Sequence, residues 1–326
     1  MPENKPDIFL NENGICNICV SHEEMKKFET MNKPLETDLL KIINKHKGRQ
    51  KYDCLVMCSG GKDSTSSLYY MKKRYRLNPL AFTFDHGYET EDALDNIKNA
   101  VDILGVDFLF FKSTFMNDMF SKILHSGSKA VICHPCSIWY MELAFDIAAR
   151  YEIPLIVAGW TKGQSTNQEI MSKCGCNVHA PEFKAMANAT VDFLNTELKD
   201  MPKYKDFPKS MEEVLKRANK KHKAMVISPH WFLPFGPDVY VETIKNELNW
   251  KVPAVSYPKG STNCMLNFIS VYNSMKHFGY THYHVEASKL IRDGFMSREE
   301  ALEQMELNFN KDLLNNIAEK LNYHFD

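Results

Sequence analysis

No stretch of the sequence approaches the roughly 20 consecutive apolar residues that are needed to span a bilayer. Residues 1–7 are too polar for a secretory signal peptide. The chain also lacks a large net charge, with 40 basic and 41 acidic residues, and it has no internal repeat and no low-complexity segment. Balanced charge gives no argument for a nucleic-acid or membrane partner. At 326 residues we therefore expect a soluble, cytoplasmic protein with one large domain or two ordinary ones.

The nine cysteines are an odd number, and most stand in groups at close spacing. In a reducing compartment such groups favour metal or catalytic sites over disulfides. Four of them could bind a structural zinc ion that pins an N-terminal knuckle to the loop after the last core strand, with His179 as a substitute ligand. Unliganded thiols are the alternative. The four are Cys16, Cys19, Cys174 and Cys176.

Cys133, Cys136 and Cys264 remain as a set of three. Three thiolates can hold a [4Fe–4S] cluster with one open iron, or a zinc ion with an exchangeable fourth position. Cys133 opens an expected helix after the strand at 108–111, which could place it over a nucleotide site. A second zinc knuckle or plain packing is the alternative.

The most informative segment is 59–65, which follows an apolar run and precedes a run that can start a helix. A strand that turns through glycines into a helix aims backbone N–H groups and the positive end of the helix dipole at one point, which favours an anion. Hydroxyl groups and a lysine add donors and positive charge. The spacing differs from that of the common nucleotide P-loop. The segment consists of Ser59, Gly60, Gly61, Lys62, Asp63, Ser64 and Thr65.

Apolar strands alternate with helical patterns between about residues 52 and 160. This alternation predicts a parallel sheet with helices on both faces and ligands at the carboxyl ends of its strands. Loop 59–65, Asp85–Gly87 and Gly159–Trp160 fall at such ends, so we expect them to converge. Asp85 and His86 could be acid/base groups, or Asp85 could cap the next helix. The expected strands are 53–58, 79–84, 108–111 and 153–158. One expected helix follows loop 59–65 and ends near residue 74, and two more span 91–105 and 137–151.

The sequence as a whole suggests three parts: an N-terminal Cys-x-x-Cys knuckle at 1–34, a nucleotide-binding domain at 35–182 and a mainly helical substrate or partner region at 183–326.

Within the last part, segment 228–237 is aromatic and proline-rich and is expected to form an ordered loop, and helices are expected from residue 267 to the end. The charged run 216–223 reads as a solvated helix face, with RNA binding as the alternative.

Segment 59–65 resembles the Ser-Gly-Gly-x-Asp-Ser loop of the PP-loop ATP pyrophosphatases, the adenine nucleotide α-hydrolase superfamily. Over most of its length the chain resembles the N-acetyl sugar amidotransferase branch (WbpG/PseA-like), which acts in lipopolysaccharide O-antigen and flagellin-sugar biosynthesis. The resemblance implies an α/β fold with a doubly wound parallel sheet of the HUP type, an N-terminal Cys-rich knuckle and a helical C-terminal region. One departure is Gly159-Trp160-Thr161, where the family has Gly-Glu-Asn. The resemblance is carried by residues 11–19, 58–64, 133–136, 153–159 and 290–302.

The resemblance implies that ATP binds with its pyrophosphate in loop 59–65 and its adenine near Phe84, Asp85 and Gly159. A substrate oxygen would attack the α-phosphorus, with Lys62 as the charge donor and Asp63 as a ligand of Mg²⁺, directly or through water. These steps would give an adenylate and pyrophosphate.

A nucleophile would then displace AMP. If it is ammonia from a separate glutaminase subunit, the product is an amide or amidine of a small-molecule acceptor such as a nucleotide-linked N-acetyl sugar. If it is sulfide carried by Cys133, Cys136 and Cys264, the reaction is a thiolation, for example of tRNA. A non-catalytic nucleotide-binding sensor is a third alternative.

Overall fold

The structure, a computed structural model, centres on a parallel sheet of five strands in the order β3-β2-β1-β4-β5. It describes residues 1–26, 34–164, 181–258, 260–261, 263–307 and 309–325. This sheet, with helices on both sides, confirms the predicted fold class. The strands are β1 (Cys54–Met57), β2 (Pro79–Asp85), β3 (Asp107–Lys112), β4 (Leu155–Val157) and β5 (Met225–Ile227).

Strands β1, β2 and β4 lie in the centre of the sheet, where helices cover both faces. Their continuous apolar sequences suit this position, because side chains on both faces are buried. The equally apolar β3 lies at the edge instead, and its Phe110 and Phe111 are 48% and 44% exposed. The fifth strand was not predicted. It pairs with β4 in parallel, so the sheet extends beyond residue 182, where the sequence suggests that the nucleotide-binding domain ends.

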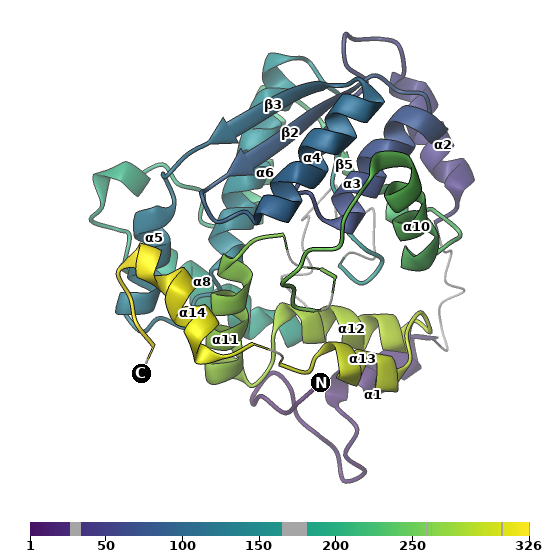
Figure 1. The fold of residues 1–326 in the computed structure, drawn as a ribbon. Helices are drawn as coiled ribbons and strands as arrows, with labels where there is room; N and C mark the ends of the chain where they lie inside the picture. The colour runs from purple at the N-terminus through teal and green to yellow at the C-terminus, as the bar shows by residue number, and fades with distance from the viewer. Residues whose placement is uncertain (27–33, 165–180, 259, 262, 308, 326) are drawn as a thin grey trace.

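Helices α3, α4 and α10 cover one face of the sheet and α6 covers the other (Figure 1). None of the helices in the described part of the chain is long and apolar enough to cross a membrane. The helices that belong to this α/β layer are α2 (Glu36–His46), α3 (Lys62–Tyr69), which continues as a π-helical turn (Tyr70–Arg74), α4 (Glu91–Leu104), α6 (Cys133–Arg150), α9 (Met211–Lys221) and α10 (Pro237–Leu248). Helix α5 (Asn117–His125) lies lower, beside the C-terminal end of the chain.

Helix α4 shows how the local sequence sets these bounds. The hydroxyl of Thr90 accepts a hydrogen bond of 3.2 Å from the Ala93 amide and caps the helix. Gly105 ends the helix in the left-handed region, with φ of 56°. The suggestion that Asp85 caps this helix is therefore wrong, because the cap lies five positions later at a residue with a better-placed side chain.

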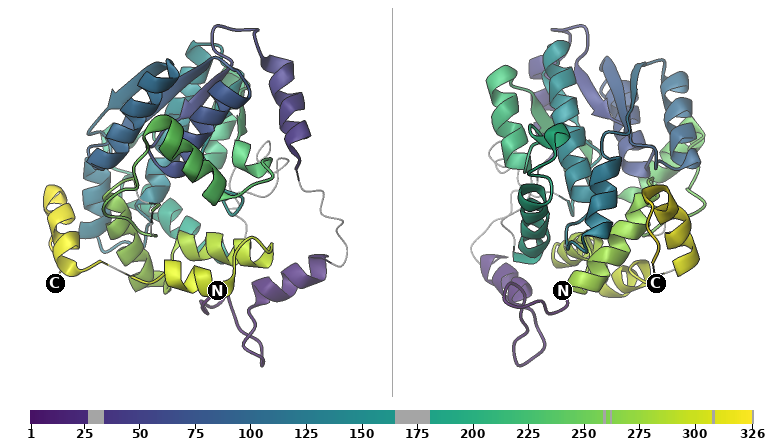
Figure 2. Two further views of the ribbon diagram at one scale, coloured as in Figure 1. Left: turned by 45° about the vertical axis from the view of Figure 1, so that its right-hand side comes forward. Right: turned by 90° about the vertical axis from the view of Figure 1, so that its left-hand side faces the viewer.

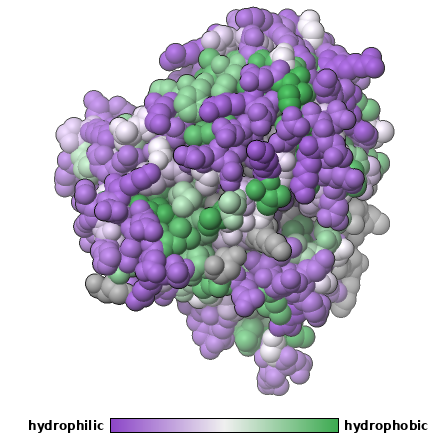
Figure 3. Space-filling model, viewed as in Figure 1, coloured by the Kyte–Doolittle hydropathy of each residue, from purple (hydrophilic) through white to green (hydrophobic). Residues whose placement is uncertain are grey.

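A second layer of helices lies below the α/β layer in Figure 1, on the side where the strands end. Most of it follows residue 265, as the sequence predicts. Apolar side chains gather along the band where the two layers meet, on a face that is otherwise largely hydrophilic (Figure 3). The helices of this layer are α8 (Pro181–Thr196), α11 (Leu266–Phe278), α12 (His282–Arg292), α13 (Arg298–Gln304) and α14 (Lys311–Ala318).

The N-terminal segment with α1 (Asn17–Lys26) packs against this second layer, far from α2 (Figure 2). The side-chain amide of Asn4 donates a 2.9 Å hydrogen bond to the carbonyl of Phe278. A small separate core, which includes Ile8 and Cys16 from the N-terminus and Tyr280 from the second layer, joins the two. The Cys-rich N-terminal region is therefore part of the helical layer.

The charged run 216–223 lies at the end of α9, largely exposed to solvent. Its cations pair with carboxylates: Lys216 Nζ lies 2.7 Å from Glu212 and Lys221 Nζ lies 2.8 Å from Asp146. The run therefore forms a charge-balanced helix face.

Candidate functional site

Loop 59–65 has the geometry of an anion site. It follows β1 directly, and Gly61 is the N-cap of α3. The first backbone hydrogen bond of α3 runs from the Thr65 amide to the Gly61 carbonyl, at 3.0 Å. The amides before Thr65 therefore lie at the open, positive end of the helix, where a phosphate oxygen can accept their hydrogen bonds.

Two of the glycines are required by packing. Gly60 has φ of 76°, and a Cβ there would lie 2.1 Å from the carbonyl oxygen of Ala93 in α4. A Cβ at Gly159 would lie 2.5 Å from the amide nitrogen of Ser64. The chain after β4 thus runs against the start of α3, and the predicted convergence of loop 59–65 with residue 159 is confirmed.

Side chains from three parts of the chain hold the loop. The Ser59 amide donates to the Ser64 hydroxyl, and the two hydroxyl oxygens are 3.1 Å apart. The Trp250 indole donates to the Gly60 carbonyl at 2.9 Å, and the Asn263 amide donates to the Ser59 carbonyl at 3.0 Å. Residues before α11 therefore touch the loop itself, which the sequence did not reveal.

Lys62 and Asp63 form an ion pair of 2.8 Å within the loop. Burial favours the neutral amine and by itself would lower the pKa of Lys62. The attraction of the Asp63 carboxylate is stronger than this effect, so the pKa of Lys62 is raised. Burial acts against the Asp63 charge as well, but Lys62, His230 and a hydrogen bond from the Tyr240 hydroxyl outweigh it and lower the pKa of Asp63. Both Asp63 oxygens are engaged, so a direct contact with Mg²⁺ would replace one of these bonds.

Three residues beside this pair were missed by sequence reasoning. His230 Nε2 lies 2.9 Å from the Asp63 carbonyl oxygen and contacts the hydroxyls of Ser66 and Ser67 in the middle of α3. Tyr240 in α10 donates to Asp63. Glu286 in α12 accepts from the hydroxyl of Thr161, and its carboxylate interacts electrostatically with Lys62. No motif marks them, because each reaches the loop from a distant part of the chain.

Asp85 and Phe84 lie at the end of β2 and are almost fully buried. The Asp85 carboxylate accepts a 2.6 Å hydrogen bond from the Gly87 amide and lies 3.3 Å from Lys112 Nζ. Phe84 stacks on Phe111 with ring centroids 6.0 Å apart. These contacts explain both residues structurally, and their predicted contact with adenine stays a prediction.

The structure brings Cys133, Cys136 and Cys264 together. Cys133 and Cys136 lie in the first turn of α6, and Cys264 lies just before α11. Burial raises the pKa of Cys264 well above its usual value, and negative charge on Glu89, Cys133 or Cys136 raises it further. Burial and Glu89 also raise the pKa of the other two thiols. The three thiols are therefore neighbours, and their predicted role as ligands of a cluster or of a zinc ion stays a prediction.

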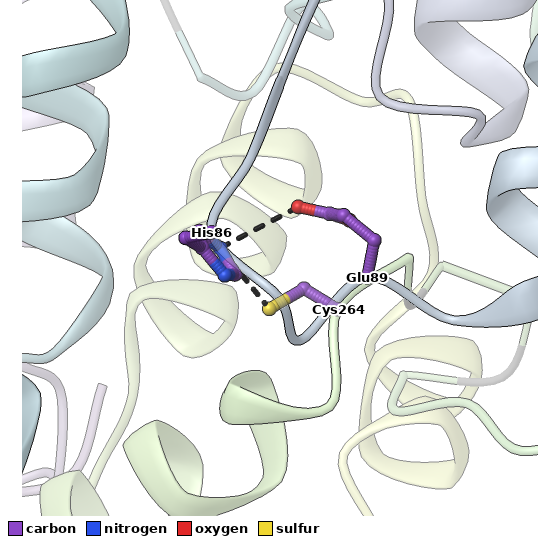
Figure 4. A group of neighbouring side chains, drawn as sticks. All are labelled: His86, Glu89 and Cys264. Carbon is purple, nitrogen blue, oxygen red and sulfur yellow. Dashed lines mark hydrogen bonds and ion pairs between the residues drawn. The ribbon is translucent and has the colours of Figure 1, made fainter. Parts of the chain in front are cut away.

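His86, Glu89 and Cys264 form a tighter group, and their side chains point toward one another in Figure 4. His86 Nε2 lies 3.4 Å from a Glu89 carboxylate oxygen and 3.6 Å from the Cys264 sulfur. Burial lowers the pKa of His86 to about 4, so the ring is neutral at pH 7.

Cys16 and Cys19 lie elsewhere, in the N-terminal segment. Burial raises the pKa of Cys19, and the neighbouring Cys16 thiol raises it further, so the two side chains are in contact. Cys174, Cys176 and His179 lie outside the described residues, and the four-ligand zinc set stays a prediction.

Two regions of the chain match known protein families. Residues 53–137 match queuosine biosynthesis protein QueC, and residues 262–325 match the C-terminal domain of LPS biosynthesis proteins similar to WbpG. The uncharacterized protein MJ1599 of Methanocaldococcus jannaschii is 30% identical over 146 residues, which are 44% of this chain and 50% of that protein. The chain thus spans about half the length of this curated relative.

Three solved structures are more distantly similar. NMN synthetase from Francisella tularensis aligns with a TM-score of 0.41 and 10% identity, over 89% of this chain and 95% of that one. U34-tRNA thiolase NcsA from Methanococcus maripaludis, determined with its [4Fe–4S] cluster, aligns with a TM-score of 0.38 and 17% identity, over 83% of this chain and 81% of that one. NH3-dependent NAD synthetase from Campylobacter jejuni aligns with a TM-score of 0.32 and 15% identity, over 57% of this chain and 92% of that one. Scores this low carry no argument about the chemistry of this chain.

Proposed function

We propose that this chain, parts of which match QueC and the C-terminal domain of WbpG-like proteins, is a PP-loop ATP-dependent transferase that activates a carbonyl or amide oxygen as an adenylate and replaces it with nitrogen. The observation that carries this proposal is the open N-terminus of α3 at loop 59–65. The match of residues 262–325 to the WbpG-like C-terminal domain favours the amidotransferase branch.

In this reaction the loop amides and the α3 dipole hold the two outer phosphates of ATP. The acceptor oxygen attacks the α-phosphorus, and the bond from that phosphorus to pyrophosphate breaks. Lys62, which the Asp63 carboxylate keeps charged, offsets the negative charge that develops on the departing pyrophosphate. Mg²⁺ bound at the phosphates would supply further charge neutralisation.

In the second half of the reaction, ammonia attacks the activated carbon and AMP leaves with the original oxygen. No glutaminase motif is apparent in the sequence, so we propose that a separate glutaminase subunit supplies ammonia. The proposed acceptor is a small molecule such as a nucleotide-linked N-acetyl sugar of surface-polysaccharide or flagellin-sugar synthesis.

Thiolation is a second candidate, favoured by the convergence of Cys133, Cys136 and Cys264. Three thiolates can hold a [4Fe–4S] cluster, which would supply an open iron for sulfide. Under this alternative the adenylation half is unchanged, and sulfide takes the place of ammonia.

The test is product analysis with ATP, Mg²⁺ and candidate acceptors, including nucleotide-linked N-acetyl sugars and tRNA. AMP and pyrophosphate are the expected products, whereas ADP and orthophosphate would refute the proposal. The Lys62→Met variant should lower kcat/KM about 100-fold or more, as for loss of one donor to a developing negative charge. Lys73→Met, at an exposed lysine further along the same helical segment, is the matched control. Mass spectrometry with ¹⁵N-ammonia or sulfide then distinguishes nitrogen transfer from sulfur transfer.

A further inference from the structure

We propose that His86, Glu89 and Cys264 bind one divalent transition-metal ion, with Zn²⁺ as the best match, through Nε2, a carboxylate oxygen and Sγ. Among the described residues, these three ligand atoms all lie within 4.8 Å of one another. The proposal goes beyond the transferase function and does not depend on it.

The distances fit tetrahedral zinc. Zinc bonds of about 2.0–2.1 Å to nitrogen, about 2.0–2.2 Å to oxygen and about 2.3 Å to sulfur, at tetrahedral angles, separate N and O by about 3.4 Å and N and S by about 3.5 Å. The structure has 3.4 Å from His86 Nε2 to the Glu89 oxygen and 3.6 Å from Nε2 to the Cys264 sulfur. The Glu89 oxygen and the Cys264 sulfur lie within 4.8 Å of each other as well, so small side-chain shifts would let one ion contact all three atoms.

Hydrogen bonding alone explains the group poorly. Nε2 carries at most one proton or one lone pair, so it can form only one strong, linear hydrogen bond with these two neighbours. The 3.4 Å contact is also longer than the about 2.7–3.2 Å of N–H···O hydrogen bonds. The second carboxylate oxygen of Glu89 and Nδ1 of His86 are buried without a hydrogen-bond partner, and these side chains are only 9% and 3% exposed. The group is thus buried and polar, with unused ligand capacity.

The backbone holds the ligands in place before any ion binds. Glu89 and Cys264 face each other in an antiparallel bridge. The Met265 amide donates to the Tyr88 carbonyl at 2.8 Å, and the Thr90 amide donates to the Asn263 carbonyl at 3.0 Å. His86 follows β2 directly. A rigid arrangement of this kind reduces the ordering cost of binding an ion.

The chemistry of the ligands selects the metal. A thiolate and an imidazole disfavour Mg²⁺ and Ca²⁺, which prefer oxygen, whereas zinc accepts sulfur, nitrogen and oxygen together. The thiolate and carboxylate also balance the charge of a divalent ion. Three protein ligands leave a fourth position open, and catalytic zinc sites share this arrangement. Asn263, next to Cys264, donates a hydrogen bond to the Ser59 carbonyl, so the backbone that carries Cys264 also contacts loop 59–65.

Cys264 also belongs to the set of three cysteines. A single ion on His86, Glu89 and Cys264 and a cluster on Cys133, Cys136 and Cys264 therefore compete for one thiolate. The test must separate these two sets.

The first experiment titrates metal-stripped protein with Co²⁺ under anaerobic conditions, without nucleotide. Apart from any Co²⁺ held by the predicted set of Cys16, Cys19, Cys174 and Cys176, we expect one Co²⁺ per chain, with a thiolate-to-cobalt charge-transfer band and the visible absorption of tetrahedral cobalt. His86→Ala and Glu89→Gln should each weaken Co²⁺ binding about 10-fold or more. The exposed His125→Ala and Glu91→Gln are matched controls and should bind Co²⁺ as the unmodified chain does. Circular dichroism shows whether each variant folds.

The proposal is overturned if the unmodified chain takes up no Co²⁺, or if His86→Ala and Glu89→Gln both bind it normally. It is also overturned if binding needs Cys133 and Cys136 but neither His86 nor Glu89.

The second experiment needs no variants, so it holds even where a variant fails to fold. X-ray absorption at the zinc edge of the zinc-loaded chain should show nitrogen and oxygen neighbours besides sulfur, including the imidazole ring of His86, and a sulfur-only shell would refute the proposal. Both experiments omit ATP, so their outcome is independent of whether the protein forms AMP and pyrophosphate.

Discussion

Substitution of Gly61 by alanine tests whether loop 59–65 binds phosphate. Gly61 is the N-cap of α3, with φ of −70°, and an added Cβ would have only one neighbour within 4 Å, the Ser59 hydroxyl oxygen at 3.6 Å. The protein itself therefore has room for alanine. A phosphate held by the loop amides would lie close to this Cβ, since the glycine allows an anion to approach the backbone.

The expected magnitudes differ for folding and binding. Loss of a glycine N-cap should cost about 1 kcal/mol of unfolding free energy or less. Loss of one hydrogen bond to a charged phosphate costs about 1.5–3 kcal/mol, which lowers affinity about 10-fold to 100-fold. Gly61→Ala should thus fold nearly normally and bind ATP–Mg²⁺ much more weakly.

Gly236→Ala is the matched control, because Gly236 is the N-cap of α10 and a Cβ there would meet nothing within 4 Å. It should lose similar stability and keep its ATP affinity. Isothermal titration calorimetry with ATP–Mg²⁺ and chemical denaturation measure the two quantities. Unchanged affinity in Gly61→Ala, or an equal loss in Gly236→Ala, would refute the assignment of the loop as the phosphate site.

Three further predictions follow from the described contacts. Gly159→Ala should destabilise the protein by about 1–3 kcal/mol or more, because its Cβ would lie within 2.8 Å of backbone atoms of Asp63 and Ser64 that cannot rotate away; an unchanged melting temperature would contradict this packing. Burial, reinforced by His284, lowers the pKa of His282 to about 4, so the unfolded chain binds more protons between pH 6.5 and 4. Stability should therefore fall over that interval by about 3 kcal/mol at most, and His282→Gln should lessen the fall in urea titrations at pH 7 and pH 5; an identical pH dependence would oppose it. If the thiolation alternative holds, anaerobically prepared protein should contain iron and a broad visible absorption that Cys133→Ala removes; a colourless, iron-free preparation that retains transfer activity would exclude a cluster.

The sequence predicted the parts of the fold that depend on neighbouring residues. The strand, glycine turn and helix around 59–65 are specified by one continuous segment, and so are the periodic α4 and its Gly105 stop. The set of Cys133, Cys136 and Cys264 was found because cysteine is rare and its spacing is distinctive. The fold makes the three side chains neighbours, and their binding of a metal stays a prediction.

The missed features depend on distant contacts. Strand β5 has three residues, Met225–Ile227, too few for a pattern, and pairing with β4 makes it a strand. Tyr240 reaches Asp63 from 177 residues away, and the sequence gives tyrosine no distinguishing mark there. Glu89 was overlooked as a ligand because a single carboxylate in a loop is common. Its position opposite Cys264 appears only when the segments before α4 and α11 pair.

The edge position of β3 has a consequence for handling the protein. A strand at the margin of a sheet offers unpaired backbone groups to another chain, and two exposed phenylalanines, Phe110 and Phe111, make such pairing more favourable. Charged residues at the two ends of the strand, Asp107 and Lys112, oppose self-association only at its margins. We therefore expect concentrated or warmed samples to aggregate through this strand first, and a lysine in place of Phe110 to keep the protein monodisperse for longer.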